Sequence, residues 1–163
     1  MSYCGYSFNI GKCTLADAVY KGREFLNNKF LAGALMSLAV KLHQVHTLGL
    51  IHGDVKADNI AIINLDPVQV TPLDYGLCVP LCSAKRSKRT GGVQYDPKLL
   101  AGDIAKCPET DIYSIGILIE CLSTAVPHLI PDPWMAFSSM LTHKDLTMRP
   151  SAMFVAKYFN TYR

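Results

Sequence analysis

The chain has 163 residues, of which 50% are hydrophobic and 18% are charged, and its formal net charge is +3. This length suffices for one domain with a core of its own, and the composition excludes a disordered chain. The longest apolar stretch, near residues 31–40, ends at Lys41 and is too short to span a bilayer. We therefore expect one intracellular, cytoplasmic domain without membrane association, and a nuclear location stays open.

Six cysteines are spread along the sequence without the density of a disulfide scaffold. Cys78 and Cys82 lie four positions apart, but no second pair with the spacing of a zinc site follows them. We expect reduced, mostly buried thiols, in keeping with an intracellular protein.

The first strong periodic pattern is an apolar stripe with the spacing of an amphipathic helix, made by Leu31, Leu35, Leu38, Leu42 and Val45. Gly49 is a suitable end for this helix. A polar loop over residues 52–58 follows, and then a short apolar strand over 60–63. Turn residues separate this strand from a second one that starts over 68–70. The pattern predicts a small β-hairpin behind a polar loop.

Two more helices are predicted after the hairpin. Residues 111–122 are apolar almost all round, which is typical of a helix buried on every side. Residues 151–162 have an apolar face and should form a terminal helix packed on one side. The predicted fold class is therefore mainly α with one small β-hairpin.

A local excess of positive charge lies between these elements, at Lys85, Arg86, Lys88 and Arg89. The run is either a solvated mobile loop or a patch that meets an acidic partner, a phosphate or nucleic acid. Because no aromatic residues interleave with it, we expect no nucleic-acid partner.

Two acidic motifs flank the hairpin: HGDVKADN at 52–59 and DYG at 74–76. Since a hairpin brings its two ends together, Asp54, Asn59 and Asp74 should converge on one small volume. Carboxylate and amide oxygens suit Mg²⁺ bound jointly with phosphates. Lys56 can offer a positive charge to a phosphoryl group in transfer, which leaves Asp54 to accept the proton of an attacking hydroxyl.

These motifs resemble the C-terminal lobe of eukaryotic serine/threonine protein kinases. LIHGDVKADNIAI resembles their catalytic loop, and LDYGL resembles their metal-binding DFG motif. DIYSIG is similar to the start of the buried F helix, LTMRPSA to the arginine-containing turn before the last helix, and MSYCGYS to the hinge between lobes. The resemblance implies one kinase C-lobe domain over residues 1–163, with a hinge-like start at about 1–12, the catalytic loop at 52–59, the metal motif at 74–76, an activation-segment-like stretch at 77–98 and the F-like helix at 111–122.

The resemblance also implies roles for individual residues. Asp54 would be the catalytic base, and Lys56 the lysine that contacts the transferred phosphate. Asn59 and Asp74 would hold the metal and, through it, the nucleotide. Ala61 would lie beneath the adenine ring. The cofactors would be Mg²⁺ and ATP if the chain is active, and none if it is not. Three further residues, His52, Tyr75 and Asp111, would be structural braces.

The sequence departs from the family pattern in several places. No glycine-rich loop, strand lysine or partner glutamate precedes the hinge-like start. Gly53 replaces the arginine that usually reads a phosphorylated activation loop. Lys98 stands where a glutamate normally pairs with the arginine matching Arg149, so Arg149 should find another acidic side chain or backbone carbonyls. The stretch from Gly116 to Arg149 leaves little room for the substrate-docking G helix, and the small Ala61 suggests a shallow adenine floor.

Three functions stay open. We expect a truncated kinase-like protein that is inactive alone and acts as a kinase-binding inhibitor or scaffold, similar to the truncated kinase by which baculoviruses disable host translation-factor kinases. The alternative is an active ATP:protein phosphotransferase whose N-lobe lies on another chain or outside these residues. A small-molecule phosphotransferase is third, because aminoglycoside and choline kinases share HGDxxxxN, but Lys56, DIYSIG and RPSA argue against it.

The expected partner is a protein, either another kinase or a separate N-lobe. It would cover an apolar surface made by Tyr3, Tyr6, Phe8, Ile60 and Ile62.

Overall fold

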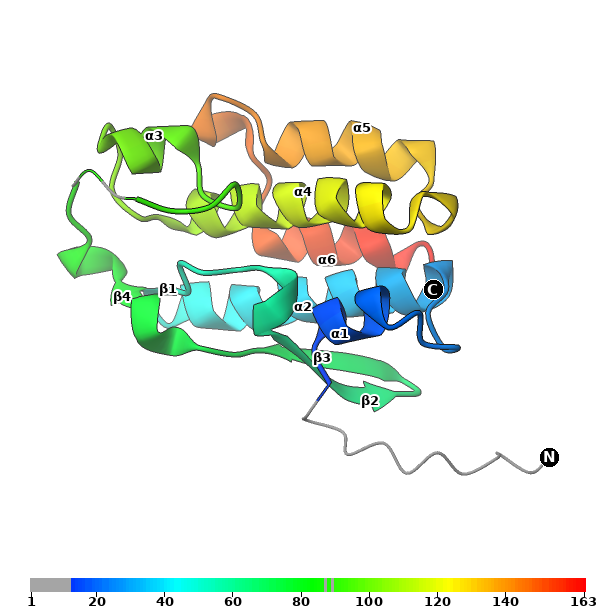
Figure 1. Cartoon of the computed structure of the whole chain (residues 1–163). Coiled ribbons are helices and arrows are strands. Elements are labelled where there is room, and N and C mark those ends of the chain that lie inside the picture. Colours follow the sequence, from blue (N-terminus) through cyan, green and yellow to red (C-terminus); the bar gives the residue numbers. More distant parts are fainter. Residues whose placement is uncertain (1–12, 87, 89) are drawn as a thin grey trace.

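The apolar stripe forms α2, Asn28–Thr47, which packs against both the C-terminal helix and the β-hairpin (Figure 1). The structure, a computed structural model, describes residues 13–86, 88 and 90–163. The side chain of Asn27 caps α2 by accepting a hydrogen bond from the Phe30 amide at 2.8 Å. The predicted stripe is fully inside the molecule, since Leu31, Leu35, Leu38 and Leu42 are each at most 1% exposed.

The second central helix is α4, Pro108–Ala125, which extends beyond both ends of the predicted range 111–122. Proline at its first position suits a helix start, because that amide would have no partner within the helix. Its apolar residues Ile112, Ile115, Leu118, Ile119 and Leu122 belong to the main core. At Gly116 the neighbouring helix comes so close that an added Cβ would lie 2.6 Å from the methyl group of Thr142.

An aromatic cluster joins the last two long helices, α5 (Asp132–Leu141) and α6 (Ala152–Asn160). Trp134 is completely buried and meets Phe159 edge to face, with 5.0 Å between the ring centroids. Phe137 stacks on Tyr158 at 3.7 Å. Between α4 and the turn that contains Arg149, α5 is the one α-helix in this fully described stretch. The short spacing between Gly116 and Arg149 is therefore filled without a separate G helix.

The predicted hairpin consists of β2 (Ile60–Leu65) and β3 (Val68–Pro72), which pair antiparallel with an irregularity between Ile62 and Asn64. Ser37 of α2 fixes the outer edge of β3, because its hydroxyl donates to the Val70 carbonyl and accepts from the Val70 amide. A second small sheet, β1 (Leu50–Ile51) with β4 (Val79–Pro80), was not predicted. Mainly helical structure with small two-stranded sheets confirms the predicted fold class.

Two shorter α-helices remain: α1 (Leu15–Tyr20), which is capped by Thr14, and α3 (Pro97–Ala101). Five single-turn 3-10 helices complete the described elements, at Ala57–Asn59, Tyr75–Leu77, Leu81–Ser83, Pro127–Leu129 and Leu146–Met148. The hinge-like start expected at about 1–12 lies outside the described residues. Among the helices of the described part, none is both long enough and apolar enough to cross a membrane. Of the five cysteines described, only Cys13 is buried, so the expectation of mostly buried thiols is wrong for this set.

Candidate active site

The hairpin brings the two acidic motifs to one end, as the sequence predicts. Ile60 pairs with Pro72, and one residue further out the Leu73 amide donates to the Asn59 carbonyl at 2.8 Å. The catalytic-loop-like segment 52–59 therefore ends beside the strand that leads directly into Asp74. Asn59 and Asp74 thus lie at the ends of neighbouring strands, where their side chains could serve one ligand.

The carboxylate of Asp111, at the start of α4, holds the first part of this loop. It accepts hydrogen bonds from the backbone amides of His52 at 2.9 Å and Gly53 at 2.8 Å, and His46 Nε2 lies 2.9 Å from it. Asp111 is 1% exposed, so these partners replace the water that it gives up. The buried helix α4 therefore holds two successive backbone amides of the loop, directly before Asp54.

The ring of His52 is also completely buried and links the two motifs. Its Nδ1 accepts from the Asp54 amide at 3.3 Å, so the proton is on Nε2, which donates to the Leu73 carbonyl at 3.0 Å. The ring of Tyr75 meets it edge to face, with 4.8 Å between centroids. His52 and Tyr75 therefore have the contacts expected of structural braces.

The carboxylate of Asp54 is the most heavily bonded group of the site. Its Oδ2 lies 3.0 Å from Lys56 Nζ and accepts from Asn59 Nδ2 at 2.8 Å. Its Oδ1 accepts from the Tyr95 hydroxyl at 2.6 Å and from Gln94 Nε2 at 3.4 Å. An ionised carboxylate offers about four acceptor sites, and here four donors face them. The structure thus brings Asp54, Lys56 and Asn59 together and adds two residues that were not predicted.

These donors set the charge state of Asp54. Burial by itself would raise the pKa of the carboxyl, but the hydrogen bonds from Tyr95 and Lys56, the charge of Lys56 and the hydrogen bond from Gln94 outweigh it. The pKa of Asp54 therefore lies below its ordinary value, and the group is ionised at neutral pH. A carboxylate of this kind can accept a proton, but its low pKa makes it a weaker base.

Asp74 differs from Asp54 in being exposed. Its backbone is left-handed, with φ 55°, and it is the one non-glycine residue with positive φ in the described part of the chain. Such a conformation is costly for a residue with a Cβ and is concentrated at functional sites. The side chain folds back to accept from the Gly76 amide at 3.1 Å, while its remaining acceptor sites face solvent.

The donor set at the hairpin end fits Mg²⁺ in chemical type. Mg²⁺ commonly takes one or two protein oxygens and completes its shell with phosphates and water. Asn59 uses its amide nitrogen on the carbonyl and carboxylate of Asp54, so its Oδ1 is the atom left for a metal. Within the described residues there is no cluster of three or more histidine, cysteine, aspartate or glutamate side chains that could hold an ion. The metal role of Asn59 and Asp74 stays a prediction.

Ala61, the predicted adenine floor, is 2% exposed. It pairs with Thr71 on β3, and Thr14 forms a bridge to it on the other side. The backbone of residues 13 and 14 therefore covers the outer edge of β2. An adenine ring could contact Ala61 only if a neighbouring group moved, and its role stays a prediction.

Gly53, at the position where the family pattern has an arginine, lies against a buried lysine. Its φ is +76°, and a Cβ there would lie 2.3 Å from Lys106 Nζ. The ammonium group of Lys106 is buried and donates to the Leu77 carbonyl at 2.5 Å. A cation from a different segment thus reaches the activation-segment-like stretch next to Gly53, which sequence spacing alone did not indicate.

The expectation for Arg149 is confirmed. Its Nη2 lies 2.6 Å from Asp96 Oδ2, and both side chains are at most 2% exposed. Its Nε donates to the His143 carbonyl at 2.8 Å and its Nη1 to the Glu109 carbonyl at 3.0 Å. The guanidinium also lies over the ring of Tyr113, 5.0 Å from the centroid. The acidic partner is therefore two positions before Lys98, at the N-cap of α3.

The apolar surface beside the site is not the one predicted. Ile60 and Ile62 are 1% and 3% exposed, because the segment around Cys13 and the main core cover β2 on both sides, so their expected exposure is wrong. Tyr3, Tyr6 and Phe8 lie outside the described residues. Four apolar side chains that follow the hairpin are exposed instead, by 38 to 49%: Leu73, Tyr75, Leu77 and Leu81. We call these four residues the apolar run.

In the basic run, Lys85, Arg86 and Lys88 are exposed, and Arg89 lies outside the described residues.

Comparison with known proteins supports the resemblance to serine/threonine protein kinases. No protein-family model matches the chain. The serine/threonine-protein kinase SKM1 of Saccharomyces cerevisiae is 31% identical over 142 residues, which cover 80% of this chain and 21% of the yeast protein. Serine/threonine-protein kinase shk2 of Schizosaccharomyces pombe is 30% identical over 74% of this chain and 20% of its own length. Calcium-dependent protein kinase 22 of Arabidopsis thaliana is 29% identical over 68% of this chain and 22% of its own length.

The chain therefore spans about a fifth of the length of these relatives. Over most of its own length it is distantly similar to serine/threonine protein kinases.

Proposed function

We propose that this kinase-like lobe does not transfer phosphate by itself and acts by binding another protein kinase, as an inhibitor or a scaffold. The observation that carries the proposal is the occupied carboxylate of Asp54. A general base needs an acceptor site within hydrogen-bond reach of the substrate hydroxyl. The Tyr95 hydroxyl already occupies Oδ1 at 2.6 Å, while Lys56 and Asn59 occupy Oδ2.

The apolar run supports a binding role. Leu73, Tyr75, Leu77 and Leu81 follow one another along the segment that leaves the hairpin, and each is at least 38% exposed. Neighbouring exposed apolar side chains of this size mark an interaction site. A second kinase could cover them with its own N-terminal lobe. Between α4 and α5 the chain forms only a single 3-10 turn, Pro127–Leu129, and no separate α-helix, which agrees with this role, since a G helix would be needed to dock a protein substrate.

A second candidate is an active ATP:protein phosphotransferase that works with an N-terminal lobe from outside these residues. The arrangement of Lys56 and Asn59 on Asp54, and the left-handed backbone of Asp74, favour it. In that case Mg²⁺ and ATP would be the cofactors: Asn59 and Asp74 would hold the ion, and Lys56 would lie near the transferred phosphate. Tyr95 would have to leave Asp54 so that the acceptor hydroxyl could take its place.

An inhibition assay separates the two candidates. The purified chain is added to the kinase domain of a translation-factor kinase and, for specificity, to an unrelated serine/threonine kinase, and phosphate transfer to each kinase's substrate is measured. We expect the wild type and Asp54→Asn to inhibit the first kinase equally, because binding needs no proton transfer. Leu77→Asp should lose inhibition, since it places a charge within the apolar run.

Leu48→Asp is the matched control for Leu77→Asp. Leu48 is 76% exposed, lies at the C-terminal end of α2 outside the apolar run, and should tolerate the same change without loss of inhibition. The opposite result, in which Asp54→Asn abolishes an activity that Leu77→Asp preserves, would assign the chain to the second candidate.

A further inference from the structure

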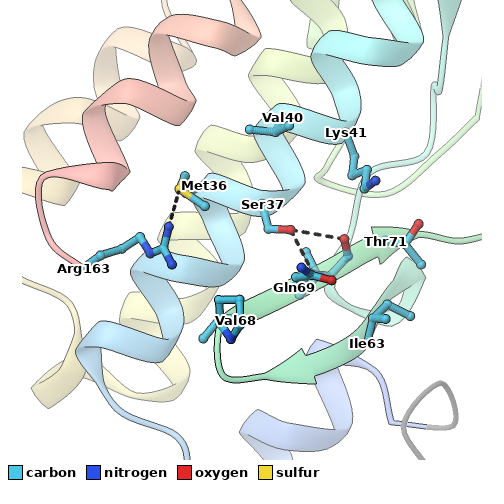
Figure 2. Close-up of a pocket in the computed structure, with 11 residues that line it drawn as sticks. Met36, Ser37, Val40, Lys41, Ile63, Val68, Gln69, Thr71 and Arg163 are labelled. Carbon is cyan, nitrogen blue, oxygen red and sulfur yellow. Dashed lines mark hydrogen bonds between the residues drawn. The ribbon is translucent and has the colours of Figure 1, made fainter.

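A groove of about 580 Å³ lies between α2 and the β-hairpin (Figure 2). It contains none of the active-site residues described above. Its walls come from the middle of α2, from the hairpin and from Arg163. It is therefore a second concave surface, separate from the site at the open end of the hairpin.

The groove combines apolar walls with a strand edge that is already occupied. Met36 and Val40 on α2 and Val68 on β3 all line it, and Ile63, which is 38% exposed, adds an apolar side chain from β2 (Figure 2). The Ser37 hydroxyl bonds both the amide and the carbonyl of Val70. A ligand cannot add to β3 as a further strand at this point, so it must bind through its side chains.

A smaller hollow of about 290 Å³ continues the groove toward the start of α2. The two share Pro67, Val68 and Arg163, and the smaller one adds the rings of Phe25 and Phe30. Lys41 lines one end of the combined groove and Lys29 lines the other, twelve positions earlier on the same helix. At 1.5 Å per residue this separation is about 18 Å, the length of an extended segment of about five or six residues.

The charge of the groove is positive. Its cations are Lys29, Lys41 and Arg163, and Asp66 at the hairpin turn is the one carboxylate among its lining side chains. No ion pair within the described residues involves any of these three cations. The Arg163 guanidinium lies beside α2, where it contacts the sulfur of Met36 at 3.5 Å (Figure 2). An elongated groove with cations at both ends and in the middle fits an extended anionic chain better than a compact ligand.

We propose that this groove docks an extended acidic peptide segment of a partner protein. Apolar side chains of the segment would pack between α2 and β3, on Met36, Val40 and Val68, while its carboxylates would face Lys29, Lys41 and Arg163. The inference rests on the shape and charge of the groove alone, and so it does not depend on the proposed binding of a kinase through the apolar run.

The test uses the whole chain and an array of short fluorescein-labelled peptides that combine glutamate with leucine in different registers. Two control arrays replace glutamate by lysine or leucine by serine, and binding is measured by fluorescence anisotropy. We expect selective binding of glutamate–leucine peptides that weakens as salt is added. Lys41→Glu and Arg163→Glu should each weaken it by about threefold or more, and Ile63→Asp should weaken it without unfolding the chain.

Lys88→Glu is the matched control, because this exposed lysine lies outside the groove and its reversal should leave binding unchanged. Circular dichroism checks that each variant is folded. The proposal is overturned if no glutamate–leucine peptide binds better than its lysine counterpart, or if Lys88→Glu weakens binding as much as Lys41→Glu. It is also overturned if anionic lipid vesicles or RNA bind the chain where the peptides do not, and if that binding is weakened by Lys41→Glu and Arg163→Glu.

Discussion

The Tyr95 hydroxyl donates a hydrogen bond of 2.6 Å to Oδ1 of Asp54. Three neighbours hold Tyr95 and its segment in place. The ring packs so closely on Gly91 that a Cβ there would lie 2.3 Å from it. Ser114 of α4 donates to the Gln94 carbonyl at 2.6 Å, and the Arg149–Asp96 ion pair anchors the next residue along the chain. The contact between Tyr95 and Asp54 is therefore built into the core of the lobe.

Tyr95→Phe should raise the pKa of Asp54 toward its ordinary value. The change removes the shorter of the two hydrogen bonds to Oδ1 and leaves the buried carboxylate less well solvated. Titration of the carboxyl carbon by ¹³C NMR measures this directly, with the exposed Asp145 as an internal reference. An unchanged pKa for Asp54 would show that Tyr95 does not hold the carboxylate in solution.

The same contact has a consequence for stability in acid. The pKa of Asp54 is lower in the folded chain than in the unfolded one, so its ionised carboxylate stabilises the fold. This stabilisation is fully present above the pKa of the unfolded chain, about 3.9, and is lost as the pH falls through the pKa of the folded chain. The free energy of unfolding should therefore decrease below about pH 4, and less steeply in Tyr95→Phe than in the wild type. Urea unfolding at a series of pH values measures both slopes; equal slopes would contradict the prediction.

Arg149→Met should destabilise the lobe by about 3–5 kcal/mol, because it leaves the carboxylate of Asp96 buried without its cation. The double variant Arg149→Met with Asp96→Asn should recover part of this loss, since the uncompensated charge is gone. Lys98→Ala is the control and should change stability by less than about 0.5 kcal/mol. Urea denaturation measures the free energy of unfolding of each variant. A larger loss of stability in Lys98→Ala than in Arg149→Met would contradict the pairing of Arg149 with Asp96.

Much of the lobe follows from local sequence patterns. The stripe of α2 is regular over its whole length, and the turn residues between two apolar runs define the hairpin, which in turn places Asn59 near Asp74. Segments of two residues, such as β1 and β4, are too short to show a period. The burial of Ile60 and Ile62 depends on residues 13 and 14, which pair with β2 from a distant part of the chain.

The chemistry of the site was less predictable than its location. Asp54, Lys56 and Asn59 belong to one loop, so their proximity is encoded locally. Tyr95 reaches Asp54 from a segment whose path depends on α4 and on Asp96. One signal for Asp96 was present: aspartate followed by proline is a common start of a helix, so this residue could have been placed at an N-cap.

Gly53→Ala should destabilise the lobe by about 1–3 kcal/mol or more, from two causes that can be separated. The backbone at Gly53 has φ +76°, which a residue with a Cβ adopts at a cost, and the new methyl group would collide with Lys106. Gly22→Ala is the matched control, because Gly22 has φ +53° and nothing within 4 Å of an added Cβ. Thermal or urea unfolding measures the loss of stability in both variants, and the difference between the two losses gives the cost of the collision with Lys106. Equal losses of stability would show that Lys106 moves away at little cost.

A divalent ion should bind where the hairpin ends, and Mn²⁺ is a suitable probe because it takes the same oxygen ligands as Mg²⁺ and broadens nearby NMR signals. In the presence of ATP, Mn²⁺ should broaden the amide signals of Asn59 and Asp74 before those of α6. Asp74→Ala should abolish this effect, whereas Asp66→Ala, at the far turn of the hairpin, should not change it. Broadening that persists in Asp74→Ala, or that follows Asp66 instead, would place the ion elsewhere and remove Asp74 from the metal site.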